Sequence, residues 1–307
     1  MTDNVFLGFD GGGTKTVAIL IDSVGHELAR AVSGPSNPLR AGFDAAFESI
    51  TFAARETLRA AGAAPEQVRG VCAGLAGAAR PSVLKLIEPF FKKMFPQAKI
   101  HITADFAVAL EAAAGEGPGV VLIAGTGSCA FGRSSDGRFA RAGGYGPWVG
   151  DPGSAYDIGR QAVSAVLHAR DALASPTLLE ERILPALELT DWDELIERLA
   201  RHPDDVFPNL FPVVVRASSE GDKVAREILF TAAGALGRLA GSVILSLGMK
   251  KERFPLAKTG GVFGHSAHLE AKLGAMLANF APAAQLFDLA NSPALGAARM
   301  ALRLSSP

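Results

Sequence analysis

The stretch VFLGFDGGGTKT, residues 5–16, decides the fold because three glycines join it to a second apolar run that follows at once. Two short apolar runs around a tight turn predict a β-hairpin, not a strand that feeds a helix. The two common phosphate-binding motifs, the Walker motif and the dinucleotide fingerprint, both stand at the start of a helix, and this stretch matches neither of them. Thr14 separates Gly13 from Lys15, and Thr16 occupies the position of the third glycine of the dinucleotide fingerprint. A turn of this kind can still present backbone N–H groups to a phosphate, with the hydroxyls of Thr14 and Thr16 beside it.

Asp10 lies at the end of the first apolar run, directly before the glycines. A carboxylate in this position suits a hydrated Mg²⁺ ion, which keeps several waters and takes few protein ligands. The alternative is an ordinary glycine-rich hairpin, in which Asp10 caps the turn and Lys15 is a solvated side chain.

The composition argues against several classes of protein. The chain has 307 residues, of which 49% are hydrophobic, so two domains with full cores can be built. A net charge of −1 argues against nucleic acid or an anionic membrane surface as a partner. Two cysteines without a CxxC motif, and an N-terminus (MTDNVFLGFD) that does not resemble a signal peptide, predict a cytoplasmic protein. No run of about 18 apolar residues suggests a membrane span.

The pattern of the first hairpin returns after a glycine-rich boundary at residues 115–119. Residues 120–129 read VVLIAGTGSC, and a second β-like run and an Asp-Gly turn follow. The repetition predicts two like halves, each with a turn that can hold phosphate. A coincidental pair of glycine-rich hairpins is the alternative.

The remaining periodicity alternates strands with helices and then becomes mostly helical between residues 153 and 247. Strands are expected at residues 26–32, 68–75, 99–103, 254–258 and 285–289. Helices are expected at residues 43–61, 81–94, 105–114, 156–168, 178–199, 222–247, 266–277 and 293–303.

Asp105 lies where the strand KIHIT meets a helix. Such positions face the crevice at the carboxyl ends of strands, where a carboxylate can act as a general base for a sugar or alcohol hydroxyl. Aspartate is equally common as a helix N-cap, and the position alone does not decide between the two roles.

Five motifs, taken in order, resemble the BadF/BadG/BcrA/BcrD ATPase family of the sugar kinase/Hsp70/actin superfamily. They are DGGGTKT, TADFA, IAGTGSCAFG, GGYGPWVGDPGSAYDIG and TGGVFG, and the resemblance covers essentially the whole chain. Within the family the N-acetylglucosamine and glucosamine kinases are most similar. The resemblance implies an α/β fold of two ribonuclease-H-like (actin-like ATPase) domains with a cleft between them. The expected domains are residues 1–115 and 116–307, the second with a helical insertion at about residues 154–250.

The resemblance also implies roles for individual residues. Asp105 is expected to be the catalytic base, and Asp10 is expected to hold Mg²⁺ through water. The residues expected to bind ATP are Gly11, Gly12, Gly13, Thr14, Lys15, Gly125, Thr126, Gly127, Ser128, Gly260 and Gly261. The residues expected to bind the substrate are Asn37, Asp105, Gly144, Tyr145 and Asp151.

Two residues depart from the family pattern. Tyr145 stands where the mammalian N-acetylglucosamine kinases carry tryptophan, and Pro152 stands where the usual GDEGS motif has glutamate. Both changes leave the kinase interpretation intact and weaken the choice of sugar. Trp148 is either a second platform for the sugar or, in preference, an anchor for its loop.

The activity implied by the resemblance is the ATP-dependent phosphorylation of N-acetylglucosamine or glucosamine at the 6-hydroxyl, by a cytoplasmic homodimer that uses Mg²⁺ and binds neither nucleic acid nor membrane. N-acetylmuramic acid or another hexose is an alternative substrate. The family also contains activator ATPases that share an iron–sulfur cluster across a dimer. Against this alternative, Cys72 falls in a predicted buried strand, and Cys129, which is expected to be a packing residue, directly follows the second turn. A non-catalytic sugar sensor would lack the base at Asp105 and would usually carry a DNA-binding segment, for which the start of the chain leaves no room.

His265 and His268 are three residues apart on a predicted helix and are expected to be a surface pair, not a metal site.

Overall fold

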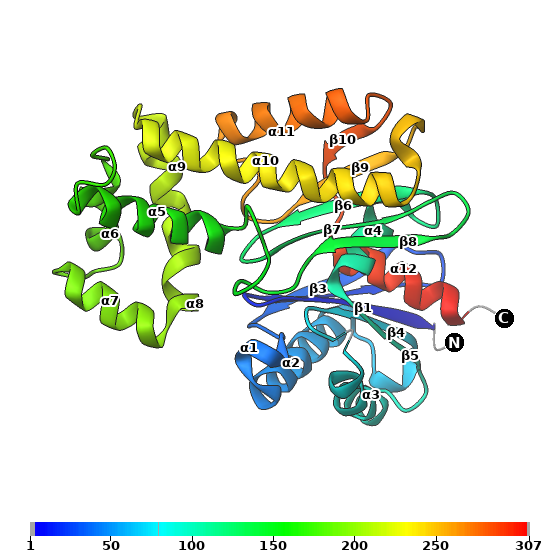
Figure 1. The fold of residues 1–307 in the computed structure, drawn as a ribbon. Coiled ribbons are helices and arrows are strands. Elements are labelled where there is room, and N and C mark those ends of the chain that lie inside the picture. Colours follow the sequence, from blue (N-terminus) through cyan, green and yellow to red (C-terminus); the bar gives the residue numbers. More distant parts are fainter. Residues whose placement is uncertain (1–3, 79, 306–307) are drawn as a thin grey trace. The chain divides into compact units, whose positions relative to one another are not determined.

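The computed structural model describes residues 4–78 and 80–305, so the first three residues of the N-terminal stretch lie outside it. The described chain forms two compact units: residues 4–117 with 289–305, and residues 118–288. Each unit is built on a five-stranded mixed sheet with helices packed against it, which confirms the predicted α/β class (Figure 1).

The sheet of the first unit has the order β3-β2-β1-β4-β5, and that of the second has the order β10-β9-β6-β7-β8. The strands of the first sheet are β1 (Val5–Gly11), β2 (Thr16–Ile21), β3 (Glu27–Ser33), β4 (Val68–Leu75) and β5 (Lys99–Thr103). Those of the second are β6 (Gly119–Ala124), β7 (Ser128–Arg133), β8 (Phe139–Gly143), β9 (Pro255–Thr259) and β10 (Gln285–Asp288).

The internal repeat extends over all five strands of each sheet. In the first unit β1, β2 and β3 are joined antiparallel, and β4 and β5 are added parallel to β1. In the second unit β6, β7 and β8 are joined antiparallel, and β9 and β10 are added parallel to β6. The two predicted glycine-rich hairpins are therefore confirmed, and each has the same place in its sheet.

Helices cover both faces of the first sheet because β1 is apolar on both sides. Leu7 and Phe9 belong to a core shared with α2 (Phe43–Ala61) and α3 (Pro81–Met94). Phe6, which points to the opposite face, belongs to a core shared with α4 and α12. The helices on this second face are α4 (Asp105–Ala114) and α12 (Pro293–Ser305).

The C-terminal helix corrects the domain boundaries expected from the sequence, which assigned residues 116–307 to the second domain. In the structure α12 packs against β1, β4 and α4, and so belongs to the first unit (red helix in Figure 1). Contact is closest at Gly8, where a Cβ atom would lie 2.1 Å from the backbone nitrogen of Ala298 and 2.2 Å from the carbonyl oxygen of Ala294. Glycine at this position allows the helix backbone to lie directly on the strand.

We predict that Gly8→Ala destabilises the protein, because the added methyl group cannot fit beside the α12 backbone. Overpacking of this kind costs about 1–3 kcal/mol. Thermal denaturation should show a lower melting temperature than that of the wild type. Gly274→Ala is the control, since a Cβ there meets no described atom within 4 Å. An unchanged melting temperature for Gly8→Ala would contradict the close packing of α12 on β1.

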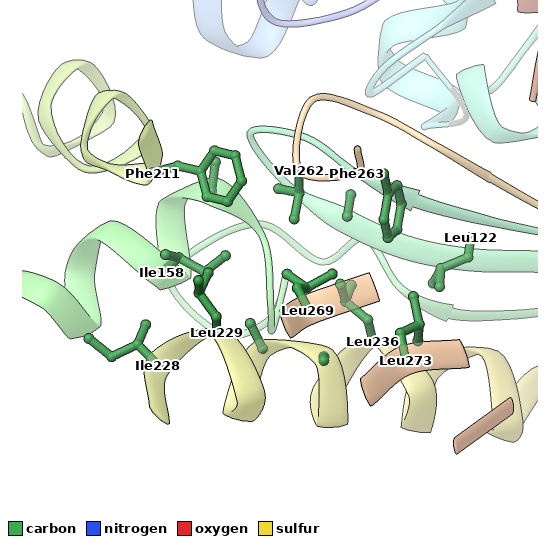
Figure 2. Close-up of a cluster of buried hydrophobic side chains, with 14 of the residues drawn as sticks. Leu122, Ile158, Phe211, Ile228, Leu229, Leu236, Val262, Phe263, Leu269 and Leu273 are labelled. Carbon is green, nitrogen blue, oxygen red and sulfur yellow. The ribbon is translucent and has the colours of Figure 1, made fainter. Parts of the chain in front are cut away.

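The second unit carries a helical segment between β8 and β9, with its core shown in Figure 2. Ile158, Phe211 and Leu229 pack together, and the cluster continues through Leu236 and Leu273 to the sheet. The helices of this unit are α5 (Ala155–Arg170), α6 (Leu179–Ala186), α7 (Trp192–Arg201), α8 (Pro203–Val206), α9 (Phe211–Ser219), α10 (Lys223–Ser246) and α11 (Ala267–Phe280).

The single helix expected at residues 178–199 is wrong, since two helices occupy this segment. The first, α6, ends at Ala186, and Glu188 adopts a left-handed backbone with φ of 56°. Asp191 then caps α7 by accepting a hydrogen bond from the backbone of Glu194 at 2.8 Å. Two amphipathic stretches of similar polarity conceal this break in the sequence.

The longest helix, α10, is apolar and long enough to cross a membrane, which the sequence analysis did not anticipate. However, 61% of its most apolar window is buried within the structure. It packs on α11 and on β6, β7 and β8, so its apolarity is explained by its place in the core of the second unit.

Candidate functional site

The first turn, residues 11–15, follows β1 and is tied to the segment after β3. The backbone N–H of Gly12 donates to the carbonyl of Lys15 at 3.0 Å, and the carbonyl of Gly12 accepts from the N–H groups of both Ser36 and Asn37 at 3.1 Å. Gly13, Thr14 and Lys15 are exposed, as phosphate binding requires. The prediction for Thr16 was wrong, because its buried hydroxyl donates to the carbonyl of Gly34 at 2.8 Å.

Asp10 and Asp105 lie at the same edge of the first sheet. β1, β4 and β5 are parallel, so their carboxyl ends meet there, and Asp105 begins α4 just after β5. Burial, together with the negative charge of Asp105, raises the pKa of Asp10 from 3.8 to about 7, and the positive charge of Lys15 opposes part of the increase. The charged side chains of Asp10, Lys15 and Asp105 are thus close enough to interact.

This edge suits a hydrated divalent cation. Two carboxylates that repel each other bind a proton or a cation readily, and oxygen is the ligand that Mg²⁺ prefers. Within residues 4–78 and 80–305 no group of three or more acidic, histidine or cysteine side chains could form a complete metal cage. Mg²⁺ held here would therefore depend on Asp10, water and phosphate oxygens.

Asn37 and Ser36 lie directly behind the first turn. The side chain of Asn37 caps α1 (Pro38–Ala41) by accepting from the N–H of Leu39 at 3.0 Å, while its amide group stays available as a donor to a ligand. The buried hydroxyl of Ser36 has no hydrogen-bond partner among the residues described, and a Cβ on Gly11 would lie 2.0 Å from it. Sequence reasoning missed Ser36, since nothing in the turn cluster SGPSN distinguishes it from a loop serine.

The second turn, residues 125–128, is connected to the 144–153 loop. The N–H of Gly144 donates to the carbonyl of Ser128 at 2.9 Å, and the Ser128 hydroxyl donates to the carbonyl of Pro152 at 2.8 Å. The hydroxyl proton of Ser128 is thus used within the protein, while Thr126 and Gly127 remain to face a ligand. Asp151 in the same loop is only 6% exposed, and its Oδ1 lies 3.4 Å from the N–H of Gly146.

The tip of the 144–153 loop carries large exposed side chains. Tyr145 is 59% exposed, and the guanidinium of Arg141 lies over its ring at 5.1 Å. Trp148 is 80% exposed, so the preferred expectation that it anchors the loop was wrong. An exposed aromatic ring three residues after Tyr145 can instead offer an apolar face to a sugar.

Gly260 and Gly261 lie against the second turn. Gly260 has a φ of 113°, and a Cβ there would lie 2.3 Å from the carbonyl of Ala124, so only glycine fits. The next residue but one, Val262, donates its N–H to the same carbonyl at 3.0 Å. The two glycine motifs of the second unit are therefore adjacent, as a nucleotide site requires.

Lys258 supports this glycine pair and was missed from the sequence. Its ammonium is buried and pairs with Glu270 at 3.0 Å and with Asp288. Glu270 also accepts the N–H of Gly264 at 2.8 Å, which fixes the loop after the glycines. A lone lysine in the apolar strand PLAKT was the available signal.

We predict that Lys258→Met weakens ATP binding and lowers stability by about 1–3 kcal/mol, because Glu270 loses its buried partner. The KM for ATP and the melting temperature should both change. Lys272→Met, on the exposed side of α11, is the control and should change neither. A normal KM for ATP in Lys258→Met would show that the pair does not support the site.

The cysteines and histidines form no group that could bind a metal ion within the part of the chain that the structure describes. Cys72 is fully buried in β4 and burial raises its thiol pKa to about 12, so it is poorly suited to bind a cluster. Cys129 is 7% exposed in β7, which agrees with a packing role, and neither cysteine forms a disulfide in the described structure. His265 precedes α11 and packs on Phe211, while His268 is on the helix, so the pair does not share a helix as expected.

Comparison with known proteins places these features in a family. The model of the BadF/BadG/BcrA/BcrD ATPase family matches residues 7–301. The N-acetyl-D-glucosamine kinase of Dictyostelium discoideum is 35% identical over 316 residues, which cover 98% of this chain and 99% of the relative. The N-acetylmuramic acid/N-acetylglucosamine kinase of Clostridium acetobutylicum is 32% identical over 294 residues, with 95% and 96% coverage.

Solved structures share the fold over the whole chain. A protein from Chromobacterium violaceum that was assigned as an N-acetylglucosamine kinase has a TM-score of 0.77, with 25% identity and full coverage of both chains. A ROK family glucokinase from Streptomyces griseus, solved with glucose and AMPPNP, has a TM-score of 0.66 at 17% identity and covers 98% of this chain and 100% of its own. These similarities confirm the expected actin-like ATPase fold.

Proposed function

Because this chain belongs to the BadF/BadG/BcrA/BcrD ATPase family, we propose that it transfers the γ-phosphoryl group of ATP to the 6-hydroxyl of an amino sugar. The observation that carries the proposal is the pairing of Asp10 and Asp105 at one sheet edge, next to Lys15 and the first turn. N-acetylglucosamine is the preferred substrate, since both relatives above 30% identity are named for it. Glucosamine and N-acetylmuramic acid are the alternatives.

In the proposed reaction Asp105 acts as the general base. Its carboxylate takes the proton of the 6-hydroxyl while that oxygen forms a bond to the γ-phosphorus, and the bond from phosphorus to the β–γ bridging oxygen breaks to release ADP. A base with its carboxylate fixed at the start of a helix needs little reorganisation, and Phe106 N–H holds one of its oxygens at 3.0 Å.

The two turns are proposed to hold the phosphates. Backbone N–H groups of the first turn and the Lys15 ammonium would supply donors to phosphate oxygens, and the Thr126 hydroxyl and the Gly127 backbone N–H would supply others. Mg²⁺, when bound through Asp10 and water, would neutralise charge on the β- and γ-phosphate oxygens. Gly260 and Gly261 would lie against the adenosine, where no side chain blocks the approach of the nucleotide.

The 144–153 loop and Asn37 are proposed to bind the sugar. Tyr145 offers a ring face, Gly144 a backbone without a side chain, and the Asn37 amide a hydrogen-bond donor. A cytoplasmic homodimer that binds neither nucleic acid nor membrane completes the proposal, and light scattering of the purified chain tests the dimer.

An assay of ADP release over a panel of sugars tests the function. We expect Mg²⁺-dependent turnover that N-acetylglucosamine, glucosamine or N-acetylmuramic acid stimulates, with glucose as the control for the 2-substituent. Phosphorus NMR of the product should show a 6-phosphate. No stimulation by any of the hexosamines would reject the proposal.

A further inference from the structure

A cation that the sequence analysis did not single out lies against the tip of the first turn. Arg40 is on α1, and its side chain runs along Gly13: a Cβ atom built on Gly13 would lie 3.4 Å from Nη1 of Arg40 and 3.6 Å from its Cδ. Gly13 and Arg40 are both exposed, so a ligand that reaches the tip of the turn also reaches the guanidinium. The tip, residues 13–15, therefore has one cation at its end, Lys15, and a second beside its first residue.

The backbone that carries Arg40 is fixed to the same turn. The carbonyl of Gly12 accepts the N–H of Asn37 at 3.1 Å, and the carbonyl of Asn37 accepts the N–H of Arg40 at 3.1 Å. Leu39 packs against the segment after β4, where a Cβ on Gly77 would lie 3.0 Å from its Cδ1. Because α1 is held from both sides, the guanidinium is placed beside the turn before any ligand binds, as a preorganised donor requires.

The charges at this edge of the sheet leave room for a second cation. Asp10 and Asp105 are two carboxylates that repel each other, and Lys15 is the cation whose charge lowers the pKa of Asp10. A nucleoside triphosphate carries more negative charge than one Mg²⁺ ion neutralises, so its binding here adds to the repulsion. Arginine suits the task because its planar guanidinium keeps its charge and can donate two parallel hydrogen bonds to phosphate oxygens.

We propose that Arg40 binds the γ-phosphoryl group of ATP at the tip of the first turn. The inference deepens the proposed function and rests on it for the placement of the phosphates at this turn. Arg40 follows Asn37, the residue proposed to contact the sugar, by three positions on the same short helix. The γ-phosphoryl group is the part of ATP that moves to the sugar, so it is the expected partner of Arg40 in preference to the α- and β-phosphates. Arg40 transfers no proton and neutralises charge on the phosphoryl oxygens during the transfer.

Calorimetric titration of the whole chain with AMPPNP and with ADP, each with Mg²⁺, tests which phosphate Arg40 binds. Arg40→Gln should weaken AMPPNP binding by about 10–100-fold, the cost of losing a hydrogen bond to a charged group, and change ADP affinity by less than about two-fold. Arg40→Lys keeps the charge without the two parallel donors, so its AMPPNP affinity should lie between those of the wild type and Arg40→Gln. A structural role for Arg40 would not separate the two nucleotides in this way.

Turnover gives a second measurement. In Arg40→Gln the kcat of sugar-stimulated ADP release should fall by about 10²–10³-fold, as when one preorganised donor to a transition state is removed. Arg55→Gln is the matched control, since Arg55 is an exposed arginine on α2 in the same unit. It should change neither nucleotide affinity nor kcat. Because both arginines are exposed, both variants should melt close to the wild-type temperature, which separates a loss of binding from a loss of fold.

Two results would overturn the inference. In the first, Arg40→Gln weakens AMPPNP and ADP equally or leaves both affinities unchanged. In the second, it binds AMPPNP normally and raises only the KM for N-acetylmuramic acid, because Arg40 would then bind the carboxylate of that sugar. If no hexosamine stimulates ADP release by the wild type, the proposed function fails. The titrations contain no sugar, so a selective loss of AMPPNP affinity would still support the assignment of Arg40.

Discussion

Replacing Asp105 with asparagine is expected to lower kcat by about 10²–10⁴-fold, the usual contribution of a general base. Asparagine has nearly the same shape, and its side-chain oxygen can still accept the Phe106 N–H that Asp105 accepts at 3.0 Å. The start of α4 should therefore be preserved while the group that takes the proton is lost. ADP release at saturating sugar measures kcat, and calorimetry with AMPPNP should show an affinity close to that of the wild type.

The competing explanation is that Asp105 only stabilises the start of a helix. Asp44→Asn is the control, since Asp44 is an exposed aspartate in the first turn of α2 in the same unit. Loss of an acidic group there should cost about 0.3–1 kcal/mol and leave kcat unchanged. If Asp105→Asn behaves like Asp44→Asn, with a small loss of stability and normal turnover, the catalytic role is refuted.

The parts of the structure that the sequence predicted well are those with a local signature. The strand–turn–strand pattern around Gly11 and again around Gly125 depends on residues within a few positions, and both hairpins are present. Asp105 could be placed at a strand end because the run KIHIT is short and the helix begins at once. The identical order of the two sheets then follows from the repetition, although only three of the five strands in each half were seen to repeat.

Features that depend on distant contacts could not be predicted. The partner of α12 is decided by the fit of Gly8 against Ala298, and an alanine-rich helix carries no sign of which sheet it covers. The hydrogen bond from the Ser128 hydroxyl to the carbonyl of Pro152, 24 residues later, joins two segments whose contact no local pattern indicates. Trp148 is exposed where an anchor was preferred, since sequence does not reveal whether a loop side chain turns inward.

Asp10→Asn is expected to stabilise the protein in the absence of metal at pH 8 and to have little effect near pH 4. The pKa of Asp10 is about 7 in the folded protein and 3.8 ordinarily, because burial and the charge of Asp105 disfavour the carboxylate. Below pH 4 the Asp10 carboxyl is protonated whether the chain is folded or unfolded, so its burial has no electrostatic cost. Between pH 4 and pH 7 Asp10 ionises in the unfolded chain but stays protonated in the folded protein. Ionisation therefore lowers the free energy of the unfolded state, and the wild type loses stability over this range. At about 1.4 kcal/mol per pKa unit, the cost above pH 7 is up to about 4 kcal/mol, which asparagine avoids.

With Mg²⁺ bound, the wild type should become more stable than Asp10→Asn at pH 8, because a cation bound through Asp10 favours the ionised carboxylate. Chemical denaturation at pH 4 and pH 8, with EDTA or with Mg²⁺ and ADP, measures both effects. Mg²⁺ with ADP should stabilise the wild type more than Asp10→Asn, and the variant should lose most of its kinase activity. Asp22→Asn is the control with the opposite sign: hydrogen bonds from His26 and Val24 lower the pKa of Asp22, so this variant should lose stability above pH 4. If Asp10→Asn is no more stable than the wild type at pH 8 without metal, Asp10 does not carry the electrostatic cost from which a metal site at this edge was inferred.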